Sequence, residues 1–224
     1  MLYGAAEFSR DTDFAVLAEV PNFNCLLSAI ADLQAECIAV PSPHLNFLLK
    51  GHALHFRCHH PDVEGMRIDI MSKMRGLDEF LQLWDRRTTI ELQDRLQVDL
   101  LSVADLVQAK KTQRDKDWPM IRRLMEVHYL QNRCNPNPDR IKFWLLEMRT
   151  PLLLAEVVKQ HPSEAAALVG KRVALSAILQ NDMSLLDATL QKEEAAEREK
   201  DRLYWQPLKF ELEALRHGIG PKET

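Results

Sequence analysis

The sequence predicts an α+β protein in which a small mixed β-sheet in the first half is followed by an all-α second half. Short apolar runs separated by Pro, Gly and Asn dominate the first hundred residues, a pattern typical of strands joined by turns. From Ser102 onward, apolar residues recur at helical spacing. The expected domains are therefore an α+β domain at 1–101 and a helical domain at 102–224.

The first half is expected to contain six short strands and two helices. The apolar runs at 53–58 and 66–71 flank a turn that contains proline and glycine, which predicts a β-hairpin. Pro21 precedes an amphipathic segment with apolar residues at helical spacing, which predicts a helix. The run at 45–49 is left unassigned. The expected strands are 14–18, 37–40, 53–58, 66–71, 88–92 and 97–101, with a turn at Gln93-Asp94, and the expected helices are about 23–33 and 76–84.

The second half is expected to be a series of helices that prolines separate. Ser102, with Asp105 three residues later, matches the start of a helix with a capping box. Pro207 is expected to break the last helical segment in two. The charged segment Lys192–Arg202 is expected to be a solvated helix. The expected helices are about 102–111, 117–131, 138–148, 151–160, 163–180, 182–203 and 207–216.

Composition limits the class of protein. The chain has 224 residues, a net charge of −4 and no apolar run of the roughly 20 residues that a membrane-spanning helix needs, so no membrane partner is expected. Its four cysteines show no pairing pattern and no secretory leader follows Met1, which together predict a reducing, cytoplasmic compartment. The mildly acidic balance gives no global attraction to nucleic acid, although local basic patches remain compatible with it.

Three aspartates carry the strongest chemical signal. Asp11 and Asp13 stand at the start of an apolar strand and point the same way, because side chains alternate along a strand. Asp69 lies between Ile68 and Ile70, where burial of a carboxylate is costly unless it is paired or bound to metal. The neighbouring Arg67 is not expected to be its partner. Solvated turn and edge-strand aspartates are the alternative interpretation.

If the two strands are adjacent, the three carboxylates form one acidic cluster. Like charges held close together repel one another unless something positive lies between them. Carboxylate oxygens suit Mg²⁺, and a site with two metals holds the cations about 4 Å apart. The sequence therefore predicts a two-metal phosphoryl-transfer site.

This order of residues resembles the polymerase-β-type nucleotidyltransferase superfamily. Gly4 stands seven residues before the Asp11-x-Asp13 element, Ser9 and Arg10 directly precede it, and a hydrophobic-Asp-hydrophobic strand follows. The block from Leu101 to Asp117, with its Lys…Arg-x-Lys-Asp pattern, is similar to the helical part of the minimal and abortive-infection toxin branches. The resemblance covers about 1–130.

The resemblance implies an enzyme that transfers a nucleoside monophosphate from an NTP to a hydroxyl and releases pyrophosphate. Two Mg²⁺ or Mn²⁺ ions would be held by Asp11, Asp13 and Asp69, and Asp69 would also be the base for the acceptor hydroxyl. Nucleotide-binding residues would be Gly4, Ser9, Arg10, Lys111 and Arg114. Asp117 would orient the last two. The acceptor would be a tRNA end, a protein hydroxyl or a small molecule, and a toxin-like protein implies a cognate antitoxin.

One departure from the family leaves an alternative function open. The Gly-Gly or Gly-Ser turn that cradles the triphosphate would fall before Met1, so either the chain begins inside the domain or phosphate binding has been lost. The alternative is a non-catalytic protein of the same fold that binds RNA or a protein partner.

Two further groups of residues have the composition of a binding site. The histidines and cysteine between His52 and His60 invite a zinc interpretation, but their spacing matches no zinc module, and a hairpin end with solvated histidines is favoured. The basic residues between Lys110 and Arg123 are either a phosphate or RNA-backbone patch or an ordinary basic helix face.

Overall fold

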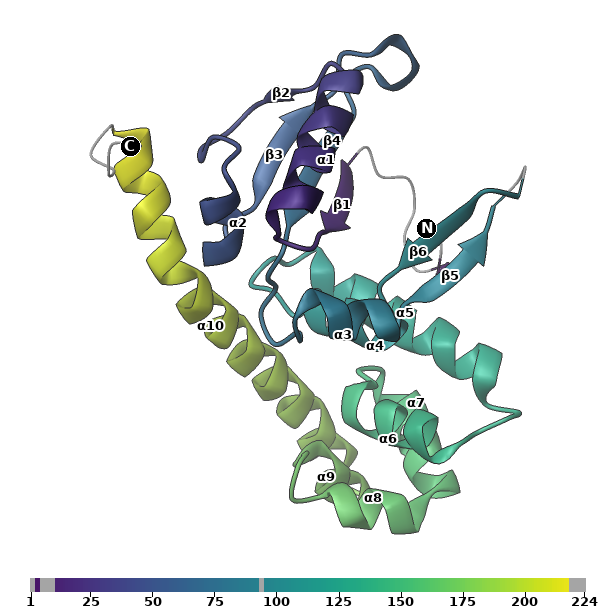
Figure 1. The fold of residues 1–224 in the computed structure, drawn as a ribbon. Helices are drawn as coiled ribbons and strands as arrows, with labels where there is room; N and C mark the ends of the chain where they lie inside the picture. The colour runs from purple at the N-terminus through teal and green to yellow at the C-terminus, as the bar shows by residue number, and fades with distance from the viewer. Residues whose placement is uncertain (1–2, 5–10, 93–94, 218–224) are drawn as a thin grey trace. The chain divides into compact units, whose positions relative to one another are not determined.

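The computed structural model describes residues 3–4, 11–92 and 95–217, and it divides into two compact units (Figure 1). The helical unit comprises Val103–Arg202 with the described residues of Met1–Glu7. The α+β unit comprises the described residues of Phe8–Ser102 and Leu203–Thr224. The change from sheet to helices thus falls between Ser102 and Val103, and the coarse expectation of an α+β fold with a mostly helical second half is confirmed.

The α+β unit is built on a four-stranded mixed sheet with the strand order β1-β4-β3-β2. Strand β4 pairs in parallel with β1 and antiparallel with β3, which confirms the predicted mixed sheet and the predicted hairpin. A separate antiparallel pair is formed by β5 and β6. The turn predicted between them, at Gln93-Asp94, lies outside the described residues. The strands are β1 Asp11–Ala15, β2 Glu36–Cys37, β3 Leu54–Arg57, β4 Arg67–Met71, β5 Thr88–Glu91 and β6 Gln97–Leu100.

The apolar face of the four-stranded sheet packs against two helices, α1 (Val20–Asp32) and α2 (Leu45–Lys50). Helix α1 lies in front of the sheet in Figure 1 and runs roughly along the strands. The run left unassigned in the sequence is thus α2, and it ends at Gly51, whose φ of 103° is a left-handed conformation that glycine adopts without strain. The core contains Phe23, Ile30, Leu48, Leu54, Phe56, Cys58, Ile68 and Ile70.

The first strand differs from the expectation in position and in burial. It begins at Asp11 rather than at residue 14, because its ladder with β4 already starts there. It is an edge strand of the sheet, and the Phe14 side chain is exposed. The two aspartates therefore lie within the strand and not ahead of it. The third helix, α3 (Phe80–Asp85), is shorter than the predicted 76–84 stretch.

Two of the predicted helix boundaries in the second half are wrong. The stretch predicted as one helix at 163–180 is two helices, because the chain turns between them at Val169–Val173, where Gly170 is a weak helix former. The stretch predicted as two helices is instead one, α10, with Pro207 inside it. The helices are α4 Val103–Ala109, α5 Asp117–Asn132, α6 Pro138–Glu147, α7 Pro151–Gln160, α8 Pro162–Leu168, α9 Ala174–Leu179 and α10 Met183–Arg216.

Helix α10 continues past Pro207 because the turns that follow the proline are held by contacts with other elements of the chain. Proline removes one backbone hydrogen bond from a helix interior and normally kinks or ends the helix. Beyond it, the Glu211 carboxylate accepts from Nε2 of the buried His52 at 2.9 Å and from Lys50. All three residues belong to the α+β unit, so the end of α10 is part of that unit's structure.

The helical unit is organised around buried aromatic residues. The Trp144 and Tyr129 rings meet edge to face with centroids 5.1 Å apart, and Trp144 Nε1 donates to His128 Nδ1 at 2.9 Å. Burial lowers the pKa of His128, and the charge of Arg140 adds to the effect, so the neutral ring that can accept this bond is favoured. The same core buries Trp118 and Met125.

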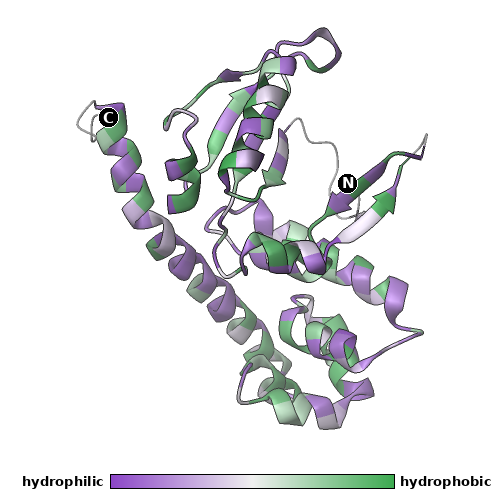
Figure 2. Cartoon of the chain, in the orientation of Figure 1, coloured by the Kyte–Doolittle hydropathy of each residue, from purple (hydrophilic) through white to green (hydrophobic). Residues whose placement is uncertain are grey.

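The charged middle of α10 is not simply solvated as expected. It is the most hydrophilic stretch of that helix in Figure 2, yet Asp201 is buried and accepts from the Gln113 backbone at 3.0 Å. Glu193 and Glu194 pair with arginines of the helical unit. Among the described residues, no helix has the length and apolar character needed to cross a bilayer.

Candidate functional site: a polar sheet face with three aspartates

The candidate site is the face of the four-stranded sheet opposite the α1 and α2 core. In the parallel pair β1–β4, Asp13 stands opposite Asp69 and Asp11 opposite Arg67. Neighbouring strands lie about 4.8 Å apart, and residues opposite each other point to the same side of the sheet. The expected adjacency of these two strands is confirmed, and the register places all three aspartates on one face.

Strand β3 adds basic residues to the same face. His55 stands opposite Asp69, and Arg57 stands opposite Arg67. Because side chains alternate, Leu54 and Phe56 of that strand face the core instead. The face therefore carries carboxylates on the β1 side and basic residues on the β3 side, and β4 contributes both an acid and an arginine.

Asp69 is held by two neighbours. His55 Nδ1 lies 2.8 Å from Asp69 Oδ1, and Arg67 Nη2 lies 3.6 Å from the same oxygen. The Asp69 side chain is 18% exposed. The expectation that Arg67 is not its partner is wrong, because residues two apart on a strand share a face. That spacing was present in the sequence and could have identified the pair.

The chemistry and the register of the three aspartates fit a divalent cation, although their side chains do not enclose one as they lie. Carboxylate oxygens are the preferred ligands of Mg²⁺ and Mn²⁺, and two of the carboxylates stand directly opposite each other. Among the described residues, no three His, Cys, Asp or Glu side chains are gathered closely enough to hold a metal ion. A cation at this face therefore requires side-chain rotation, with Asp69 shared between the metal and its present partners.

The basic block of the resemblance lies in the helical unit, in the connection between α4 and α5. Lys111 and Arg114 do not share a helix face, because α4 ends at Ala109 and α5 begins at Asp117. Arg114 Nε donates to the buried Asp117 carboxylate at 2.9 Å, whereas Lys111 Nζ donates to Glu147 at 2.8 Å. Asp117 thus orients Arg114, and Lys111 is held by a different acid.

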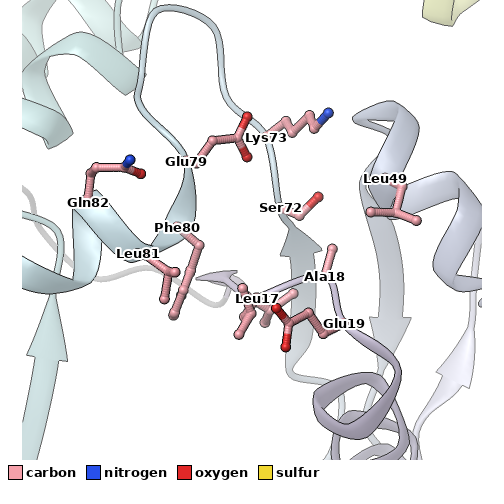
Figure 3. Close-up of a pocket in the computed structure, with 11 residues that line it drawn as sticks. Leu17, Ala18, Glu19, Leu49, Ser72, Lys73, Glu79, Phe80, Leu81 and Gln82 are labelled. Carbon is pink, nitrogen blue, oxygen red and sulfur yellow. The ribbon is translucent and has the colours of Figure 1, made fainter.

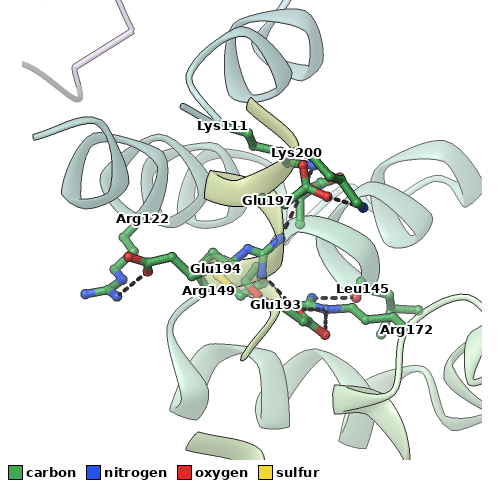
Figure 4. Close-up of polar contacts among 11 residues, drawn as sticks. Lys111, Arg122, Leu145, Arg149, Arg172, Glu193, Glu194, Glu197 and Lys200 are labelled. Carbon is green, nitrogen blue, oxygen red and sulfur yellow. Dashed lines mark hydrogen bonds and ion pairs between the residues drawn. The ribbon is translucent and has the colours of Figure 1, made fainter. Parts of the chain in front are cut away.

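Lys111 belongs to a larger ion network, because its partner Glu147 also lies 3.9 Å from Arg149 Nη2. Figure 4 draws part of this network. Arg149 Nη1 donates to Glu193 at 2.7 Å, and Arg172 Nε reaches the same carboxylate at 3.1 Å. Lys111, Arg149 and Arg172 are all buried. Because a buried charge without a partner is costly, the network explains these basic residues as supports of the helix packing.

The remaining predicted nucleotide-binding residues come from the start of the chain. Gly4 has a φ of 73°, and a Cβ there would lie 3.8 Å from Val127 of α5, within the helical unit. A left-handed conformation of this kind favours glycine for the backbone alone. Ser9 and Arg10 lie outside the described residues.

A pocket that the sequence did not indicate lies at the carboxyl ends of β1 and β4 (Figure 3). Its volume is about 250 Å³, and it contains none of the three aspartates. Lys73 and Glu79 supply charged groups, and Leu49 and Phe80 supply apolar surface. Ligands of sheets with parallel strands commonly bind beyond the carboxyl ends of those strands. The parallel pairing of β1 with β4 is therefore the feature that indicates a pocket at this position.

The side chains of the histidine-rich segment 52–60 are directed to different partners. His52 pairs with Glu211, His55 with Asp69, and His59 lies between Glu36 and Glu64 at 3.3 and 3.2 Å. Hydrogen bonds to these two glutamates raise the pKa of His59. Cys58 is buried in the core. These side chains therefore have separate partners.

Comparison of the chain with protein-family models, with curated proteins and with solved structures gives no match in any of the three.

Proposed function

We propose that this chain is a nucleotidyltransferase-like protein that binds divalent cations through Asp11, Asp13 and Asp69 and acts on an NTP. The observation that carries the proposal is the parallel register of β1 and β4, which sets Asp13 opposite Asp69. Three carboxylates on one sheet face, with arginines beside them, suit a metal–triphosphate complex.

Each residue of the face has a role in this proposal. Asp11, Asp13 and Asp69 would hold Mg²⁺ or Mn²⁺. Bound there, the metal would supply charge neutralisation for the phosphates and a lower pKa for the attacking hydroxyl. Asp69 would accept the proton of the acceptor hydroxyl, and His55, which lies 2.8 Å from its Oδ1, would keep that carboxylate oriented.

A second function is favoured by one specific contact. The Asp69 carboxylate already lies between His55 and Arg67, a partial charge balance that requires no cation. A non-catalytic protein of the same fold, which binds RNA or a protein partner, would keep this arrangement in all its states. The two proposals differ in whether a metal competes for Asp69.

Thermal unfolding with and without metal separates the two functions. Millimolar Mg²⁺ or Mn²⁺ is expected to raise the melting temperature of the wild type, since a ligand at one hundred times its Kd stabilises the folded state by about 2.7 kcal/mol. The double variant Asp11→Asn/Asp13→Asn is expected to lose the shift and, without metal, to melt no lower than the wild type, because one source of repulsion is gone.

The matched control is Asp32→Asn/Asp62→Asn, which removes two exposed carboxylates of the α+β unit that do not belong to the site. It should retain the metal-dependent shift. A wild type whose melting temperature is unchanged by either metal would favour the non-catalytic function.

A further inference from the structure

Two arginines stand directly opposite each other on the polar face of the sheet. Arg57 of β3 and Arg67 of β4 are register partners in the antiparallel ladder. Side chains of such partners leave the sheet with Cβ atoms about 4.5–5.5 Å apart, and like charges at this position are unfavourable. A pair of this kind is stabilised when an anion lies between the two guanidinium groups.

Acids flank the pair on both sides, Asp11 opposite Arg67 and Glu36 opposite Arg57, but they do not fully occupy these arginines. Glu36 stands opposite Arg57, but its carboxylate pairs with His59 at 3.3 Å. Within the described part of the chain, no ion pair is found for Arg57, and Arg67 has one at 3.6 Å, to an oxygen already bonded to His55. Arg67 Nε is buried without a hydrogen-bond partner. Reorientation of the Arg67 side chain toward an anion would satisfy this donor.

We infer that Arg57 and Arg67 form a binding site for a phosphate group, with the phosphates of a nucleotide as its source. Guanidinium forks bind phosphate oxygens through pairs of parallel hydrogen bonds, and two of them can share one phosphate. Asp69 lies two residues along β4 from Arg67, a distance of about 7 Å. A polyphosphate held by the arginines therefore reaches the carboxylates that the proposed function assigns to the metal.

The charges around the pair favour a short polyphosphate over a nucleic-acid backbone. The same face carries four acidic residues on β1, β4 and β2, namely Asp11, Asp13, Asp69 and Glu36. An extended polyanion would run across these carboxylates, and its affinity depends on neutralising many phosphates in a row. Two arginines suit one or two phosphates.

The phosphate site is inferred from the two arginines alone. Only the statement that the bound phosphates belong to a nucleotide rests on the proposed function. The test is therefore calorimetric titration with inorganic tripolyphosphate in the presence of EDTA. Wild type is expected to bind, and Arg57→Gln and Arg67→Gln are each expected to weaken binding about tenfold or more, as loss of a charge-assisted contact does. Arg67→Lys keeps the charge but loses the planar guanidinium, so its affinity for tripolyphosphate should lie between those of the wild type and Arg67→Gln.

The control variant is Arg123→Gln/Lys192→Gln, which removes two exposed positive charges from the helical unit and should bind tripolyphosphate like the wild type. Arg57 is exposed, so Arg57→Gln remains informative if Arg67→Gln does not fold. ATP should bind through the same arginines and adenosine should not, which identifies the phosphates as the group recognised.

Three results would overturn the site. These are no binding of tripolyphosphate by the wild type, equal binding by Arg57→Gln and the wild type, and arginine-dependent binding of a single-stranded RNA oligonucleotide without binding of tripolyphosphate. The titration contains no free metal, so it tests the phosphate site separately from the metal site. If tripolyphosphate binds but Mg²⁺ and Mn²⁺ do not change the melting temperature, the proposed metal site is rejected and the phosphate site is retained.

Discussion

Replacement of Arg172 by leucine is expected to destabilise the helical unit by about 3–5 kcal/mol, the range for removing one partner of a buried ion pair. Arg172 is 5% exposed. Its two terminal nitrogens donate to the carbonyl oxygens of Leu145 and Met148, each at 2.8 Å, and its Nε reaches Glu193 (Figure 4). Those carbonyl groups lie at the C-terminal end of α6, where the helix offers no further backbone N–H to donate to them. Urea unfolding at neutral pH measures the loss.

A variant of Glu193, the acid that pairs with Arg172, shows whether the loss of stability comes from the lost ion pair or from the lost side-chain packing. Removal of Arg172 leaves Glu193 with Arg149 alone in this cluster. The double variant Arg172→Leu/Glu193→Leu should therefore be less destabilised than the sum of its single variants, with a coupling of about 0.5–3 kcal/mol. Burial lowers the pKa of Arg172, and the nearby Arg149 adds to the effect, so the charge is costly without its acid. Strict additivity would show that the two side chains act independently.

Replacement of Trp144 by alanine should cost the helical unit about 3–5 kcal/mol, since the large side chain leaves a cavity in a packed core. Trp144 is fully buried, contacts the ring of Tyr129 and donates to His128. Trp144→Phe keeps most of the apolar volume and loses the hydrogen bond, so its smaller deficit measures that bond. Chemical unfolding of both variants is the measurement, and a deficit below about 1 kcal/mol for Trp144→Ala would mean that the site collapses around the missing ring.

Local patterns predicted most of the fold, and the error at Pro207 occurred where contacts distant in sequence decide the structure. The hairpin of β3 and β4 and the start of α1 follow from turn chemistry and helical spacing. The continuity of α10 through Pro207 depends on Glu211, whose partners Lys50 and His52 lie more than 150 residues away. The proline alone predicts a break in the helix, and no local rule can supply the contacts that hold the helix beyond it.

The residue types of the candidate site were predictable, and so was the pair of Arg67 with Asp69 on one strand, but partners from other strands and helices were not. Alternation placed Asp11 with Asp13, and it placed Asp69 on the face of its strand opposite Ile68 and Ile70. The contact of Asp69 with His55 depends on the register of β3 against β4, which the length of their connection does not determine. Lys111 was expected near phosphates, but its partner Glu147 lies 36 positions further along the chain.

Binding of Mn²⁺ followed by electron paramagnetic resonance tests the central claim most directly, because the free ion and the bound ion give separate signals. With a non-hydrolysable NTP analogue present, the wild type is expected to bind up to two Mn²⁺ ions per chain, as a two-metal site requires. Asp13→Asn is expected to lose this binding, because Asp13 stands opposite Asp69 and two residues from Asp11 on the same face of the sheet. Asp32→Asn/Asp62→Asn should bind as the wild type does. Equal Mn²⁺ binding by Asp13→Asn and wild type, or no binding by either, would contradict the assignment of these aspartates to a metal site.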